Sequence, residues 1–153
     1  MIKYPQPVKF HKKSAQLQVD LSRPKEEQTQ DGKTRATSGC VFFTIAKALG
    51  DGSDRMDWNN KILMKIDHVD IAKIVTSTRE AKFPVDIYHK SANTGDSSTL
   101  KIEPGQNPGT FKLFMGKTRN GQKSYAQIYL NTEDMFILFN LLEASVPVTL
   151  GWL

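Results

Sequence analysis

The chain has 153 residues, of which 39% are hydrophobic and one is cysteine, and its formal net charge is +5. This size suits one compact domain or two small repeats that share a core. A lone cysteine excludes an internal disulfide and favours a reducing, intracellular setting. No apolar run reaches the length of a membrane span, so we expect no membrane partner. The net charge gives only a mild attraction to polyanions.

The first half of the chain predicts four strands followed by a helix. The strands are expected at residues 7–14, 17–21, 39–49 and 61–66. The polar stretch 22–38 cannot bury much apolar area and predicts a long mobile hairpin loop around Asp31-Gly32. Residues 50–60 predict a polar turn region. Asp67 then predicts the N-cap of a short helix, with Asp70 in its first turn.

The same order of elements restarts at Phe83. The strands are expected at residues 84–91, 100–102, 109–117 and 125–130. Asn120-Gly121 predicts a tight hairpin turn, and the polar stretch 92–98 predicts a linker. Asn131 takes the capping position of Asp67, and a helix follows over 132–145. The chain therefore predicts one domain built of two β-β-β-β-α repeats, at about 5–80 and 83–146, with a docked apolar C-terminal tail at 147–153.

Each predicted helix must bury its apolar stripe against one face of its sheet. The alternation of apolar residues assigns that face to Val41, Phe43, Ile45, Ile62, Met64 and Ile66 in the first repeat, and to Phe111, Leu113, Met115, Ala126, Ile128 and Leu130 in the second. The residues between them point to the opposite face. That face combines lysines with aromatic rings.

This second face is the predicted binding surface. The lysines expected to follow a nucleic-acid backbone are Lys9, Lys13, Lys61, Lys65, Lys90, Lys101, Lys112 and Lys123. The rings expected to stack on bases are Phe42, Tyr88, Phe114, Tyr125 and Tyr129. Duplex DNA hides its base faces, so such rings select single strands. Each residue also has a structural interpretation, because lysines commonly occupy the wet face of a sheet and aromatic residues pack across strands.

The junction Ile128-Tyr129-Leu130-Asn131-Thr132-Glu133-Asp134 resembles the strand-to-helix junction of positive cofactor four, and Lys123 suits the basic strand of that family. Two such units resemble a protomer of the Whirly proteins, which share a superfamily with positive cofactor four and the Pur-alpha repeat. The Lys-Gly-Lys-Ala-Ala-Leu motif of plant Whirly proteins is absent from this sequence, so their higher assembly is not implied. The resemblance implies an α+β fold of curved antiparallel sheets packed on paired helices, and single-stranded nucleic-acid binding.

The second predicted helix is apolar on nearly all sides, which favours both pairing with the first helix and a homo-oligomer formed through the helices. No catalytic, metal or cofactor site is expected, because the sequence lacks a phosphate-cradling glycine loop, a metal-ligand spacing and a nucleophile arrangement. The three histidines, His11, His68 and His89, are expected to be surface or phosphate-contacting groups.

The sequence therefore predicts a non-enzymatic protein that binds single-stranded DNA with little sequence preference in replication, recombination or repair. The expected location is the cytoplasm of a bacterial or phage-infected cell. Two alternatives stay open. One is an RNA-binding protein or transcriptional cofactor, and the other is a structural protein that uses its aromatic sheet face as a protein interface.

Overall fold

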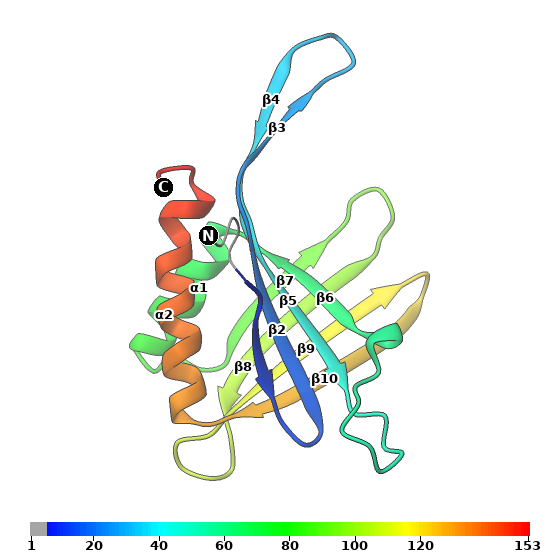
Figure 1. Ribbon diagram of the computed structural model, residues 1–153, viewed down its shortest axis with the longest axis vertical. Helices are drawn as coiled ribbons and strands as arrows, with labels where there is room; N and C mark the ends of the chain where they lie inside the picture. Colours follow the sequence, from blue (N-terminus) through cyan, green and yellow to red (C-terminus); the bar gives the residue numbers. More distant parts are fainter. Residues whose placement is uncertain (1–5) are drawn as a thin grey trace.

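The computed structural model describes residues 6–153, and over that range the protein is an α+β fold of two four-stranded antiparallel sheets, two α-helices and a two-stranded ribbon (Figure 1). The first sheet has the strand order β1-β2-β5-β6, with β1 at Val8–His11, β2 at Ala15–Ser22, β5 at Cys40–Lys47 and β6 at Ile62–Ile66. The second has the order β10-β9-β8-β7, with β7 at Val85–Lys90, β8 at Ser97–Pro104, β9 at Phe111–Arg119 and β10 at Gln122–Leu130.

The two sheets use the same strand register. The pairs that run across the first sheet are Val8 with Val19, Val19 with Phe43 and Phe43 with Met64. The corresponding pairs across the second sheet are Val85 with Ile102, Ile102 with Leu113 and Leu113 with Ile128. These are the residues that the sequence aligns between its two halves. The two units also differ, because the first contains the extra ribbon and a 3₁₀ turn, η1, at Trp58–Asn60.

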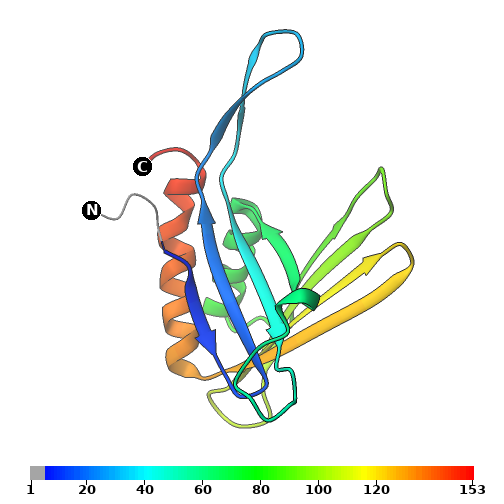
Figure 2. The ribbon, with the colours of Figure 1, turned by 45° about the vertical axis from the view of Figure 1, so that its right-hand side comes forward.

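The inner faces of both sheets and the helices enclose one hydrophobic core. Every residue predicted for the core face is buried except Phe111, which is half-buried. Cys40 begins β5 and is buried, and burial raises the pKa of its thiol. Figure 2 shows that the sheets lie close at one end and diverge towards the other. Their outer faces therefore form two separate surfaces.

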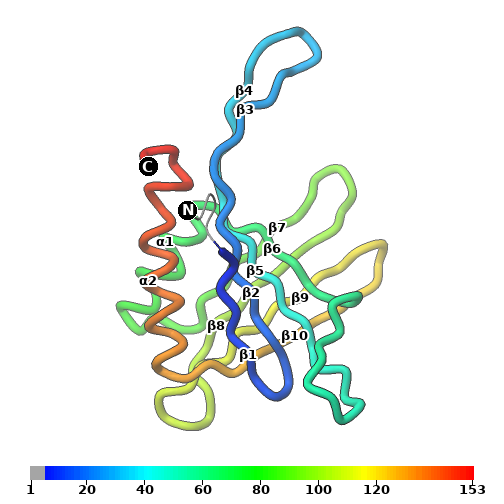
Figure 3. Tube along the Cα trace, viewed as in Figure 1, coloured from blue at the N-terminus to red at the C-terminus, as the bar shows by residue number. Residues whose placement is uncertain are grey.

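Both helices begin with the predicted caps. Asp67 caps α1 (His68–Arg79) and Asn131 caps α2 (Thr132–Thr149), and each cap forms a reciprocal capping box with the aspartate three residues later. The helices lie side by side in Figure 3 and contact each other, and Arg79 forms an ion pair with Glu143 between them. No helix within residues 6–153 combines the length and apolar content needed to cross a membrane.

The polar stretch 22–38 forms a hairpin with its turn at the predicted place, but its arms are paired strands and not the predicted loop. Strand β3 (Lys25–Gln28) pairs with β4 (Thr34–Thr37), and the ribbon projects beyond the body of the protein (Figure 1). All but one of its strand residues are exposed, so neither face carries an apolar period that could have revealed it. Gly32, with φ of +78°, closes the turn at the predicted position.

The second helix is longer than predicted. It continues through Pro147 and ends at Thr149, and Gly151, whose φ is +80°, follows the C-cap residue Leu150. Gly151 donates to the Val148 carbonyl and Trp152 to the Pro147 carbonyl, the paired bonds of a Schellman C-cap. The prediction of a docked tail was also wrong, because Trp152 is 82% exposed.

Candidate nucleic-acid interface

The outer face of the second sheet carries four neighbouring rows of side chains, three with one residue from each strand and a fourth with residues from β8, β9 and β10 only. Tyr88, Thr99, Gly116 and Tyr125 form one row across β7, β8, β9 and β10. The rows beside it are Asp86, Lys101, Phe114 and Gln127 on one side, and Lys90, Ser97, Thr118 and Lys123 on the other. A further row, next to the Asp86 row, consists of Glu103, Lys112 and Tyr129. The sheet therefore gathers four predicted rings and four predicted lysines on one surface.

A hollow of about 300 Å³ lies at the centre of this surface, and Tyr88 and Tyr125 are among the residues that line it. Gly116 lies beneath the hollow and is buried, because the Thr99 methyl and the Phe114 ring pack closely over it. A Cβ atom at Gly116 would lie 3.1 Å from the Thr99 methyl and 3.3 Å from the Phe114 ring. Thr99, Phe114 and the two tyrosines therefore line a shallow surface on which an aromatic base could lie.

The rings differ in how much of their surface is free. Tyr88 is 63% exposed, Tyr125 is 58% exposed and Tyr129 is 50% exposed, whereas Phe114 is half-buried. Tyr125 is stacked on Phe114 with ring centroids 5.9 Å apart, and the Lys47 ammonium lies 4.3 Å from the Tyr125 ring centroid. The stacked pair is a preorganised platform, because part of the ring surface is already fixed by its neighbours. Tyr88 is the freest ring of the hollow.

The lysines of this face also divide into two kinds. Lys112 lies 2.7 Å from Glu103 and Lys101 lies 4.0 Å from Asp86. The hydrogen bond between Lys112 and Glu103 lowers the pKa of the Glu103 carboxyl and raises the pKa of the Lys112 ammonium. Both groups therefore stay charged at neutral pH, and each is partly neutralised by the other.

Lys90 and Lys123 have no carboxylate within 4.0 Å in the described part of the chain. They occupy the two edges of the face, next to the tyrosine row. Their ammonium groups are the ones most available to a phosphate.

The remaining predicted residues lie elsewhere. Phe42 is half-buried on the outer face of the first sheet, where it pairs with Asp20 and Lys65. The other lysines predicted to contact the backbone are exposed on the first sheet or next to it: Lys9, Lys13, Lys61 and Lys65. Because the outer faces of the two sheets are separate surfaces, the predicted site residues do not form a single patch.

Two residues of the surface were not predicted. Lys47 belongs to the core-side alternation of β5, so only the crossing of the two sheets brings it to Tyr125. Gly116 did carry a signal, because a glycine inside a strand often marks a close approach by another group. Within residues 6–153 no group of three or more histidine, cysteine, aspartate or glutamate residues is placed to hold a metal ion.

Comparison with solved structures finds the same fold in plant proteins. The crystal structure of WHY3 from Arabidopsis thaliana superposes with a TM-score of 0.82 at 16% identity, covering 99% of this chain and 92% of that one. The plant transcriptional regulator PBF-2 gives 0.81 at 19% identity, covering 99% and 86%. A guide-RNA-binding protein complex bound to a guide RNA gives 0.58 at 12% identity, covering 94% and 91%.

No curated protein sequence matches the chain. The family model described as the Whirly transcription factor, however, matches residues 10–138. This match spans most of the chain and both sheets, and it agrees with the shared fold. The protein therefore belongs to the Whirly transcription factor family.

Proposed function

We propose that this protein binds single-stranded DNA with little sequence preference, on the outer face of its second sheet. The observation that carries this proposal is the hollow over Gly116 between Tyr88 and Tyr125, with Lys90 and Lys123 beside it. The rings provide stacking platforms for unpaired bases, and the ammonium groups attract the backbone. Neither interaction reads the identity of a base, and binding rather than catalysis is the proposed role.

Membership of the Whirly family and the name of that family support nucleic acid as the ligand. The similar structure favours RNA as the second candidate, because that guide-RNA-binding protein complex is bound to a guide RNA. Stacking and phosphate contacts do not separate ribose from deoxyribose. Competition of one labelled strand by matched DNA and RNA oligonucleotides decides between them.

The experiment that tests the proposal is fluorescence anisotropy with labelled single-stranded and duplex DNA of equal length. We expect the single strand to bind more tightly, and its affinity to fall steeply as salt is raised. A preference for duplex would contradict stacking. Absence of single-strand binding at low salt would instead favour the protein-interface alternative for the aromatic face.

We further propose replication, recombination or repair as the setting, because sequence-tolerant binding suits the protection of any exposed strand. A role in transcription is the alternative that the family name favours. Oligonucleotides of different composition separate the two, since a transcriptional regulator should prefer a particular sequence.

We also propose that the two units are copies of one ancestral β-β-β-β-α unit. Their equal register and equivalent capping boxes support this origin. A homo-oligomer formed through the helices is proposed as well. It is supported by the exposed apolar side chains of Val69 on α1 and of Phe136 and Ile137 on α2.

A further inference from the structure

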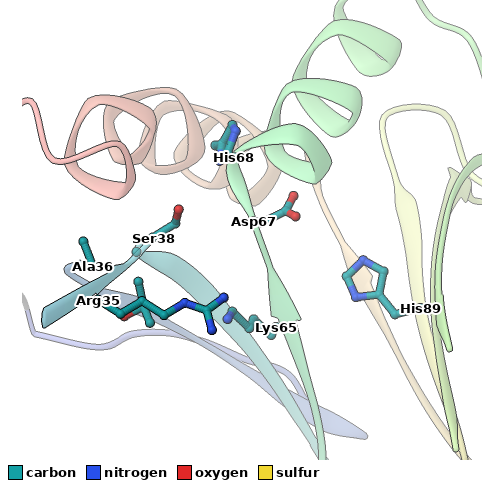
Figure 4. Close-up of a pocket in the computed structure, with 9 residues that line it drawn as sticks. Arg35, Ala36, Ser38, Lys65, Asp67, His68 and His89 are labelled. Carbon is teal, nitrogen blue, oxygen red and sulfur yellow. The ribbon is translucent and has the colours of Figure 1, made fainter. Parts of the chain in front are cut away.

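A cavity of about 470 Å³ lies where the β3–β4 ribbon joins the body of the protein. Figure 4 shows it between the ribbon base, the end of β6, the start of α1 and strand β7. It shares no lining residue with the hollow over Gly116. It is therefore a second candidate site, and strand β7 is the one element that lines both.

Two cationic side chains enter this cavity from different elements. Arg35 comes from β4 of the ribbon and Lys65 from β6 of the first sheet, and Figure 4 shows both on the same side of the cavity. In the described structure neither group has a carboxylate within 4.0 Å. Like charges that line one cavity repel each other, so an anion placed between them is favoured.

The carboxylate that lines the cavity, Asp67, is already engaged, and Glu27, which pairs with Arg35 across the ribbon, does not line it. Asp67 accepts a hydrogen bond of 2.9 Å from the Asp70 backbone N–H as the cap of α1. Asp70 lies 2.9 Å from the His89 ring nitrogen Nε2. Asp67 faces the cavity from the wall opposite Arg35 (Figure 4), so its charge confines an anion to the Arg35 and Lys65 side.

We propose that this cavity binds a phosphate group between the Arg35 guanidinium, the Lys65 ammonium and the Ser38 hydroxyl. A guanidinium donates two parallel hydrogen bonds to phosphate oxygens, and an ammonium adds a point charge. The Ser38 hydroxyl lines the same cavity. A phosphate group has enough oxygens to accept hydrogen bonds from donors on three sides. A carboxylate has only two oxygens, so phosphate suits this arrangement better.

Phosphate in this cavity would join two parts of the molecule. Arg35 belongs to the projecting ribbon and Lys65 to the first sheet, so a bound phosphate links the base of the ribbon to the body. The phosphate comes either from a nucleic-acid strand or from free phosphate in solution. The first source deepens the proposed function and rests on it, whereas the second does not.

The test is a titration of the full chain with inorganic phosphate, in which two-dimensional NMR monitors the backbone amide resonances. A titration with sodium chloride of equal ionic strength is the reference. We expect saturable shifts at residues 35–39, 65 and 89. Shifts that chloride reproduces, or no shifts at millimolar phosphate, would overturn the proposal.

The variant Arg35→Gln should weaken the phosphate affinity about tenfold, the effect of losing a charge-assisted hydrogen bond. Lys33→Gln is the matched control, because Lys33 carries the same charge on the same ribbon but does not line the cavity. If both variants weaken phosphate equally, only the overall charge of the ribbon matters and the site is wrongly assigned.

The source of the phosphate follows from three further probes. A single-stranded oligonucleotide with a 5′-hydroxyl that displaces inorganic phosphate from the cavity identifies a backbone phosphate. Displacement only by the 5′-phosphorylated oligonucleotide identifies a terminal phosphate, and displacement by neither leaves free phosphate as the ligand. If the oligonucleotide binds and phosphate does not, this proposal fails and the single-strand proposal stands. If phosphate binds and the oligonucleotide does not, the single-strand proposal fails and this proposal stands.

Discussion

At the scale of single residues, Tyr88 is the ring on which a base-stacking role is most directly tested. It is 63% exposed, so Tyr88→Ala should leave the free energy of unfolding within about 0.5 kcal/mol of the parent. Stacking contributes about 1–3 kcal/mol per base, so single-strand affinity should fall about tenfold or more. Anisotropy with an oligonucleotide measures the affinity, and thermal unfolding measures the stability.

Two companion variants sharpen this prediction. Tyr88→Phe keeps the ring and should bind like the parent. Trp152→Ala removes a ring that is 82% exposed but lies outside both sheets, and it should also bind like the parent. Equal losses for Tyr88→Ala and Trp152→Ala would mean that the sheet face has no special role.

The ion pair between Lys112 and Glu103 leads to the opposite kind of prediction, a gain of affinity. Glu103→Gln removes a carboxylate from the proposed face and releases the Lys112 ammonium from its partner. We expect single-strand affinity to rise several-fold at low salt. The slope of log K against log salt should steepen by about 0.7 if the released group contacts one phosphate.

Glu80→Gln is the matched control for this gain. Glu80 also pairs with a lysine, Lys82, and its loss changes the net charge by the same amount. It lies at the C-cap of α1, away from the second sheet. If Glu80→Gln raises the affinity as much as Glu103→Gln does, the effect is one of overall charge and not of this surface.

At the scale of elements, the cap of α1 predicts a pH-dependent stability. Burial raises the pKa of Asp67, but the hydrogen bonds from Asp70 together with the nearby His68 and His89 hold that pKa below its ordinary value. The folded state thus favours ionised Asp67. The stability that it contributes is complete above the unfolded pKa of about 3.9 and is lost as the pH falls through the lower folded pKa.

The variant Asp67→Asn keeps a capping oxygen and removes the charge. We expect it to be less stable than the parent at pH 7 by about 0.3–1 kcal/mol, the value of an acid at a helix N-terminus. The difference should vanish near pH 2, and urea unfolding at several pH values measures it. Asn131→Ser changes the neutral cap of α2, so its free energy of unfolding should differ from that of the parent by the same amount at pH 7 and near pH 2. A constant difference for Asp67→Asn would contradict the role of its charge.

The elements also show which signals in the sequence predict structure. The strands of both sheets were predicted because one face of each is buried, which leaves a period of two along the chain. The ribbon β3–β4 has no buried face and left no such period. Pro147 suggested that α2 ended early, yet Gly151 marked its true end, because only the glycine supplies the left-handed C-cap conformation.

At the scale of the whole molecule, the arrangement of the two sheets decides which predicted residues lie together. Alternation along each strand correctly separated core residues from outward ones such as Tyr129. It does not give the direction in which one sheet crosses the other, because that depends on how two complete faces pack. Phe42 and Tyr125 were therefore predicted for one surface and lie on two, while Lys47 reached Tyr125 unpredicted.

The helices, which lie beside the sheets, carry the apolar surface that the monomer leaves uncovered. Phe136 is 69% exposed and Ile137 is 47% exposed on α2, and Val69 is 63% exposed on α1. Burying a large apolar side chain stabilises by about 1.5–3 kcal/mol, so covering Phe136 and Ile137 would favour the proposed homo-oligomer. In that proposal the same helix face of a second copy covers these two side chains.

The variant Phe136→Glu tests this arrangement, because a carboxylate at that position cannot be buried without a partner. We expect it to weaken self-association about tenfold or more, seen as a fall in molar mass by light scattering after size exclusion, while the far-ultraviolet circular dichroism stays that of the parent. Asn93→Glu adds the same charge to an exposed loop away from the helices and should leave the molar mass unchanged. A monomeric parent, or an unchanged mass for Phe136→Glu, would show that the exposed side chains of α2 do not join copies of this chain.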